Sequence, residues 1–235
     1  SQSIDSMKDR GPDEKGLWIS ENKLIALGHT RLSIIDLSKR SNQPMTSICG
    51  FIKIVFNGEI YNFNKLKNKL LKLGHSFKSN SDTEVIIECY KEWKEDFSKH
   101  LLGMFSIALY DSRIKKVFLV RDRVGEKPLY YFFKNGNLIF SSKLNTIIEN
   151  SLVDKKLCKR SLRNYLEYGY SPSSNSIVDN IKKLMPGHIL SYSLSDKQIK
   201  ISRYWKPPLR DININYDLNE HIENIYDLLK KAVKS

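Results

Sequence analysis

Cysteine is scarce in this sequence, and long apolar runs are absent. The three cysteines, Cys49, Cys89 and Cys158, lie far apart, so they match neither a disulfide framework nor a zinc-binding spacing. No apolar segment approaches the roughly 20 residues that a helix needs to cross a bilayer. No signal peptide and no internal repeat are visible either. These absences predict a cytoplasmic protein that holds its cysteines as thiols, binds no metal and has no membrane partner.

Acidic residues are fewer than basic ones, and the net charge is +13. Such a balance can indicate nucleic-acid binding. The lysines are instead spread along helical stretches, as at Lys65, Lys67, Lys69 and Lys72, and elsewhere they alternate with acids. This pattern is typical of a solvated, lysine-rich surface and predicts no nucleic-acid partner.

The hydrophobic pattern changes between periods of 2 and 3.6 residues, which predicts an α+β domain with antiparallel sheets. A β run over 51–56 ends at Asn57-Gly58, a dipeptide typical of turns. Ser81-Asp82-Thr83-Glu84 has the form of a capping box and opens a predicted helix over 81–93. Further helices are predicted over 3–9, 64–73, 142–150, 161–168 and 218–233, and hairpins over 17–28 and 188–204. Four β runs between 104 and 140 are expected to form one antiparallel meander.

Several polar residues lie next to these elements and offer the groups that a free amino acid needs. Arg31 can bind a carboxylate through two hydrogen bonds, and Asp82 can hold an ammonium. The Asn57 amide beside the Gly58 N–H can form an oxyanion hole, because glycine lets the backbone come close. Each residue also has a structural explanation: a turn for Asn57-Gly58, a helix N-terminus for Asp82, and a surface pair with Asp36 for Arg31. The residue types alone leave both interpretations open.

The order of motifs along the chain favours the first interpretation. Seven motifs follow one another: Arg10-Gly11-Pro12-Asp13, Gly28-His29-Thr30-Arg31-Leu32-Ser33-Ile34-Ile35-Asp36, Gln43-Pro44-Met45, Phe56-Asn57-Gly58-Glu59-Ile60-Tyr61-Asn62, Ser81-Asp82-Thr83-Glu84, Gly103-Met104-Phe105 and Arg121-Asp122-Arg123-Val124-Gly125-Glu126-Lys127-Pro128-Leu129-Tyr130-Tyr131. This series resembles the class II glutamine amidotransferase domain of glutamine-hydrolysing asparagine synthetases. The resemblance extends from Arg10 to about Ala232, and the Arg-Leu-Ser-Ile run favours the asparagine synthetase branch of the class.

The resemblance implies a fold and a set of roles. The implied fold is a four-layer αββα sandwich of two antiparallel sheets, as in N-terminal nucleophile hydrolases. The implied substrate is L-glutamine, held at its carboxylate by Arg31 and at its ammonium by Asp82. The remaining implied site residues are Asn57 and Gly58 as the catalytic oxyanion hole, Glu59 and Gly58 as positioning groups, and Ile34 and Ile35 as the pocket lining.

The family's nucleophile is a cysteine at the mature N-terminus, whose own α-amino group is the base. Family spacing puts this cysteine well upstream of Arg10, whereas nine residues precede Arg10 here. By its spacing Ser1 would belong to the helix whose end is predicted over 3–9, and Cys49 has no partner nearby in sequence, so neither is expected to replace it. The stretch as given is therefore expected to be inactive.

Relatives continue into an ATP-pyrophosphatase domain with a phosphate-binding Ser-Gly-Gly-x-Asp-Ser loop, which does not occur here. We therefore expect a glutamine amidotransferase domain over 1–205 and, over 206–235, a linker and the first helix of a synthetase domain. That synthetase domain is the expected partner and would use ATP and Mg²⁺, while this chain is expected to need no cofactor. The resemblance leaves homodimer formation open.

The resemblance implies an ammonia-supplying domain of an enzyme that makes asparagine from aspartate, glutamine and ATP. Two alternatives stay open, namely amidation of a sugar carboxylate in a surface polysaccharide and a non-catalytic scaffold. The sequence departs from the family at Lys143, where relatives carry an acidic residue after the β runs. No role can be assigned to that position.

Overall fold

The computed structural model describes residues 14–31, 42–172, 174–208 and 218–234. The motif over 10–13 and the predicted helix over 3–9 lie outside these residues. The chain divides into two compact units, Ser1–Trp205 and Lys206–Ser235. The second unit contains the helix α7 (Leu218–Lys234), where the 3.6-residue pattern predicted one. Its assignment to a synthetase domain stays a prediction.

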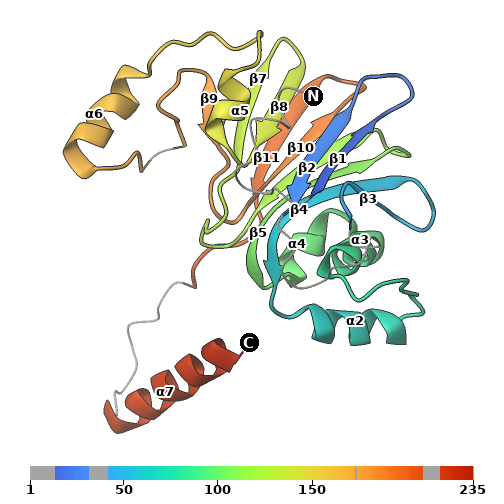
Figure 1. Cartoon of the computed structure of the whole chain (residues 1–235). Helices are drawn as coiled ribbons and strands as arrows, with labels where there is room; N and C mark the ends of the chain where they lie inside the picture. Colours follow the sequence, from blue (N-terminus) through green and yellow to red (C-terminus); the bar gives the residue numbers. More distant parts are fainter. Residues whose placement is uncertain (1–13, 32–41, 173, 209–217, 235) are drawn as a thin grey trace. The chain divides into compact units, whose positions relative to one another are not determined.

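A six-stranded antiparallel sheet forms the centre of the described part of the first unit (Figure 1). Across the sheet its strands are β11 (Gln198–Arg203), β10 (His188–Ser193), β6 (Lys116–Arg121), β5 (Gly103–Asp111), β4 (Ile52–Ile60) and β3 (Met45–Thr46). β5 and β6 are buried along most of their length, because other layers cover both faces of the sheet. β3 pairs only with Lys53 and Ile54, so the rest of the outer edge of β4 has no strand beside it among the described residues.

The second β layer consists of two pieces that pack on one face of the central sheet. One is the hairpin of β1 (Glu14–Ile19) and β2 (Ala26–Arg31). The other is a three-stranded antiparallel sheet of β8 (Asn137–Ser141), β7 (Tyr130–Lys134) and β9 (Ile181–Lys183). Buried side chains from both pieces meet those of the central sheet in one core cluster, which includes Leu27, Val55, Leu119, Tyr131 and Leu190.

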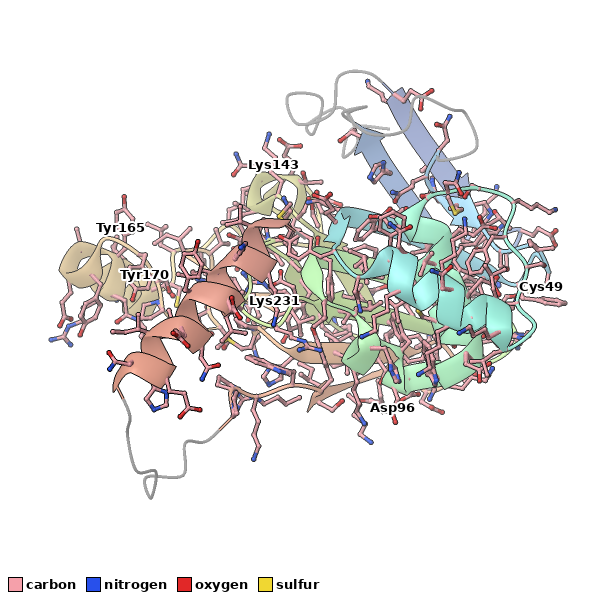
Figure 2. All side chains as sticks on the ribbon, turned by 90° about the horizontal axis from the view of Figure 1, so that it is seen from below. Cys49, Asp96, Lys143, Tyr165, Tyr170 and Lys231 are labelled. Atoms are coloured by element: carbon pink, nitrogen blue, oxygen red, sulfur yellow. The ribbon has the colours of Figure 1, made fainter. Side chains whose placement is uncertain are left out.

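Helices form the two outer layers. The other face of the central sheet packs against α2 (Phe63–Lys72), α3 (Asp82–Trp93) and α4 (Phe97–His100), with a 3-10 turn at Lys94–Asp96. On the second layer, α5 (Leu144–Ile148) packs against β7, β8 and β9. The predicted four-layer αββα arrangement is confirmed. α6 (Lys159–Tyr168) carries the exposed Tyr165, and Tyr170 follows it (Figure 2).

The predicted meander between 104 and 140 is wrong in its pairing. All four strands are present, but β5 and β6 belong to the central sheet, whereas β7 and β8 belong to the second layer. The segment between β6 and β7 therefore crosses from one sheet to the other. Turn signals between neighbouring strands cannot reveal whether the next strand pairs beside the last one or stacks above it.

The side chain of Asp122 stabilises this segment between β6 and β7. Its side chain is fully buried, and its carboxylate accepts hydrogen bonds from five backbone N–H groups, those of Phe105, Val124, Gly125, Glu126 and Lys127. The neighbouring Arg121 donates to three backbone oxygens, those of Gly125, Lys127 and Leu184. Together the two side chains satisfy backbone polar groups of a partly buried, irregular loop.

We expect Asp122→Ala to lower the free energy of unfolding by about 3 kcal/mol or more, because five N–H groups, that of the buried Phe105 among them, lose their shared acceptor at once. Chemical denaturation of both proteins measures the difference. The matched control is Asp154→Ala, which removes an exposed carboxylate that pairs with Lys156 at 3.0 Å. This control should change the free energy by no more than about 0.5 kcal/mol. Equal effects of the two substitutions would contradict the organising role of Asp122.

Candidate functional site

Asn57 and Gly58 lie inside β4, not at its end, so the predicted turn is wrong. Gly58 pairs with Phe105 on β5 and has φ of +148°, a conformation that side chains disfavour. A Cβ atom built on Gly58 would lie 2.0 Å from the backbone oxygen of Met104. The glycine is therefore required by the close approach of β5 and by its own backbone conformation.

The Gly58 N–H faces the outer edge of β4. In an antiparallel pair, backbone groups point alternately toward and away from the partner strand. Phe105 exchanges hydrogen bonds with Asp122 on the far side of β5, so the Gly58–Phe105 pair is one whose groups point apart. On β4, the N–H groups of Phe56 and Ile60 both bond to side chains at this outer edge, which gives Gly58 between them the same direction.

Neither donor of the predicted oxyanion hole forms a hydrogen bond within the described part of the chain. The Gly58 N–H has no hydrogen-bond partner there, and neither has the side-chain amide of Asn57. Asn57 and Glu59 are half-buried and project from the same face of β4, since side chains alternate along a strand. The arrangement presents an amide and an N–H side by side at an open strand edge.

Asp82 closes one end of this edge. It is the first residue of α3, and its Oδ2 accepts a hydrogen bond from the Ile60 N–H at 3.4 Å. Burial raises the pKa of Asp82 above its ordinary value, and the nearby charge of Glu59 raises the pKa further. A buried carboxylate beside a second acid is an environment that a bound cation would stabilise.

The capping box that opens α3 is only half formed. Ser81 accepts a hydrogen bond from the Thr83 N–H at 3.2 Å, as predicted for an N-cap. Glu84 does not bond back to the Ser81 N–H. Its carboxylate instead accepts hydrogen bonds from the N–H groups of Lys78 and Ser79 and from the Ser79 hydroxyl. The start of α3 is thus held in place by the loop before it.

Gln43 and His29 close the other end of the edge, and the sequence motifs did not reveal this role. The Phe56 N–H donates to Gln43 Oε1 at 2.5 Å, and His29 Nε2 lies 3.1 Å from the Phe56 oxygen. Both side chains occur in the motifs named above. Their contacts with β4 could not be read from the motifs, because the partners are backbone atoms distant in sequence.

The carboxylate-binding part of the predicted site is only partly described. Ile34 and Ile35 lie outside the described residues. The backbone of Arg31 ends β2, opposite Glu14, and His29 two residues earlier reaches Phe56. The chain that carries Arg31 therefore approaches the edge of β4 at its Gln43 end.

None of the three cysteines lies at this edge. Burial raises the pKa of the Cys89 thiol, inside α3, to about 12. Cys49 lies in the turn before β4, and about 20 Å separates the start of β4 from Gly58, given the rise of a strand. Partial burial acts in the opposite direction, yet the Ser47 hydrogen bond and the charges of Lys91 and Arg113 lower the pKa of Cys49. Cys49 therefore has partners that its sequence context did not reveal.

Lys143 precedes α5 in the outer layer. It is the N-cap residue of that helix, and its backbone N–H donates to Ser141 Oγ at 3.0 Å. Figure 2 shows Lys143 well apart from Cys49. The departure from the family pattern at Lys143 thus lies on an element that does not form the edge of β4.

Two absences, of a membrane-spanning helix and of a metal-binding cluster, concern only the residues that the structure describes. None of the helices in that part of the chain is long and apolar enough to cross a membrane. No three His, Cys, Asp or Glu side chains there gather closely enough to hold a metal ion.

Comparison with known proteins shows which family the chain belongs to. The family model for a glutamine amidotransferase domain matches residues 1–205. The chain belongs to the glutamine amidotransferase family. Among curated relatives of this amidotransferase domain, asparagine synthetase [glutamine-hydrolyzing] 3 of Bacillus subtilis is 32% identical over 99% of the chain and 38% of its own length. Amidase chry2 of Gibberella zeae is 37% identical over 80% of the chain and 27% of its own length.

The amidotransferase domain spans less than half the length of these curated relatives. Among solved structures, glutamine phosphoribosylpyrophosphate amidotransferase of B. subtilis matches with a TM-score of 0.53. The match covers 81% of this chain and 36% of that one, at 19% identity. It supports the fold of the amidotransferase domain.

We expect Gly58→Ala to destabilise the domain by about 3 kcal/mol or more, because a Cβ would collide with the Met104 oxygen on β5. The matched control is Gly74→Ala. Gly74 also has positive φ, +89°, but a Cβ there would meet no atom within 4 Å. The control should therefore show only the backbone cost of about 1 kcal/mol. Thermal and chemical denaturation would contradict the close-approach argument if both variants lost the same stability.

Proposed function

We propose that the open edge of β4 binds L-glutamine and activates its side-chain amide for hydrolysis. The observation that supports this most is the Gly58 N–H, which has no hydrogen-bond partner among the described residues and lies between the anchored residues Phe56 and Ile60. The Asn57 amide is adjacent and also uncommitted among the described residues. Two donors of this kind suit an oxygen that gains negative charge during acyl transfer.

The substrate's other groups would meet the two ends of the edge. Asp82 and Glu59 would hold the ammonium, since both carboxylates lie at the Ile60 end and the charge of Glu59 raises the pKa of Asp82. Arg31 would bind the carboxylate, with Ile34 and Ile35 lining the pocket as the family resemblance implies. These anchors would place the side-chain carbonyl near Asn57 and Gly58.

The reaction proposed for this site is the family's thiol chemistry. The thiolate of an N-terminal cysteine attacks the side-chain carbonyl carbon of glutamine, and Asn57 and Gly58 stabilise the tetrahedral oxyanion. Collapse of that intermediate, with a proton from the α-amino group, releases ammonia and leaves a thioester. Water then hydrolyses the thioester to glutamate. Cys89 and Cys158 lie on or beside helices and Cys49 at the distant end of β4, so none of them suits this role.

For the longer protein, we propose the synthesis of asparagine from aspartate, glutamine and ATP, with ATP and Mg²⁺ bound by a partner synthetase domain. The asparagine synthetases among the relatives support this. The relative chry2 is named an amidase, so not every relative is named an asparagine synthetase. Amidation of a sugar carboxylate remains the alternative proposal, and it rests on the family resemblance. The proposal includes a cytoplasmic location, where a reducing setting would keep the cysteines as thiols.

The pH dependence of amino-acid binding tests the role of Asp82. Its pKa is raised, so it binds a proton at a pH where an exposed aspartate would be ionised. A bound ammonium favours the ionised form. Affinity for L-glutamine should therefore fall as the pH drops through the raised pKa, and binding near that pH should release a proton. Nuclear magnetic resonance titrations between pH 4 and 8 measure the affinity, and calorimetry in two buffers measures the proton.

Asp82→Asn serves as the control for this prediction. It should weaken binding about tenfold or more, through the loss of a charged hydrogen-bond acceptor, and should remove the pH dependence. Above the raised pKa it should also stabilise the domain, because the folded state no longer holds a buried charge. A pH profile shared by wild type and Asp82→Asn would contradict the assignment. A wild-type chain that binds no glutamine would favour the scaffold alternative.

A further inference from the structure

We propose that Gln43 is a positioning residue for the glutamine amide, because its side chain fixes the separation between the oxyanion strand and the start of α3. This inference rests on the proposed function. It assigns to Gln43 no contact with substrate. Its role would be to hold Gly58 where the Gly58 N–H meets the amide oxygen.

The side chain of Gln43 connects the two elements that carry the site. Its Oε1 accepts the Phe56 N–H at 2.5 Å, and its Nε2 donates to the hydroxyl of Thr83 at 3.5 Å. The Phe56 N–H can only donate, so it determines which end of the amide is the oxygen. Phe56 directly precedes Asn57, and Thr83 directly follows Asp82. One amide thus joins the neighbours of both predicted binding groups.

Gln43 also stands where the strand ladder is interrupted. β3 pairs Met45 with Ile54, and the same register extended by two residues would place Gln43 opposite Phe56. The structure has no strand pairing there among its described residues, and the Gln43 side chain accepts the Phe56 N–H instead. The Gln43 side chain thus satisfies the Phe56 N–H without a strand at this position, and no strand among the described residues lies beside Gly58.

The backbone of Gln43 is held by a close contact with β1. A Cβ atom built on Gly16 would lie 1.8 Å from the Gln43 backbone oxygen. Gly16 therefore allows the hairpin of the second layer to press directly against Gln43. The strand that contacts the Gln43 backbone, β1, belongs to the second β layer. The residues that bond to the Gln43 side chain, Phe56 and Thr83, belong instead to the central sheet and to α3.

Gly58 thus lies between two positions of β4 that side chains anchor. At one end Gln43 joins Phe56 to Thr83, and at the other Asp82 accepts the Ile60 N–H at 3.4 Å. Gly58 lies two residues from each anchored position. Loss of the Gln43 connection would free one end of this short segment and misplace the Gly58 N–H, while the charged groups that bind the amino-acid part stay in place.

The test compares two ligands, L-glutamine and L-norvaline, which share the ammonium, the carboxylate and a three-carbon side chain. Norvaline has no side-chain amide, so it reports only the amino-acid part of the site. The wild-type chain should prefer glutamine by about threefold to tenfold, the range expected for one hydrogen bond to the amide oxygen. Glutamine alone should shift the Gly58 amide resonance, in titrations followed by nuclear magnetic resonance.

Gln43→Met removes both hydrogen bonds and keeps the side-chain length. We expect it to reduce the affinity for glutamine toward that for norvaline, to leave the norvaline affinity unchanged and to abolish the Gly58 shift. Gln43→Glu should restore the preference, because a carboxylate still accepts the Phe56 N–H and the Thr83 hydroxyl can donate to it. Gln198→Met, on the exposed edge strand β11, is the matched control and should behave as wild type. If Gln43→Met does not fold, Thr83→Val removes one anchor and should reduce the preference in its place.

The possible outcomes distinguish a failure of the proposed function from a failure of the role of Gln43. A wild-type chain that binds neither amino acid would overturn the proposed function. A wild-type preference for glutamine that persists in Gln43→Met, or in Thr83→Val, would overturn only the role of Gln43. Equal weakening of both ligands would also overturn it, since that is the effect of a merely structural residue.

Discussion

The missing side chain at Gly58 is the constraint on which the rest of the site depends. It lets β5 approach until the Met104 oxygen occupies the place of a Cβ, and it permits a backbone conformation that other residues disfavour. An unpaired strand edge is ordinarily a liability, because its free N–H and C=O groups invite other chains to pair. Here the Phe56 and Ile60 N–H groups on either side of Gly58 are satisfied by side chains. Among the described residues, the part of this edge without a hydrogen-bond partner is thereby limited to a short stretch around Gly58.

Much of the fold could be predicted from the sequence, because the periods of its apolar residues report which faces are buried. The helical pattern of α2, with Leu66 and Leu70 buried, and the cap at Ser81 are local features. The wrong predictions share a physical cause. Asn57-Gly58 is typical of turns, but a glycine is equally required where two backbones touch. The strands β6, β7 and β8 follow β5 closely in sequence. The chain nevertheless leaves the central sheet after β6, through a loop that Asp122 stabilises by accepting hydrogen bonds from backbone N–H groups.

The candidate site was predictable to a lesser degree. Motif order pointed to Asn57, Gly58 and Asp82, and the structure brings them to one edge of β4. The supporting residues were not predictable, since their partners lie far along the chain: Gln43 meets Phe56 and Thr83, and His29 meets the Phe56 oxygen. A side chain that bonds to a backbone group leaves no pattern of its own at the partner position. Such contacts emerge only when the layers are assembled.

The electrostatics of this edge lower the stability of the folded domain. Burial raises the pKa of Asp82, which means that its ionised form costs free energy in the empty domain, and the charge of Glu59 adds to this cost. An exposed aspartate at the start of α3 would serve the helix equally well and would not carry that penalty. A cation bound beside Asp82 would offset this penalty. A neutral amide alone gives no such relief, which is why the ligand proposed for this edge carries an ammonium as well as an amide, as glutamine does.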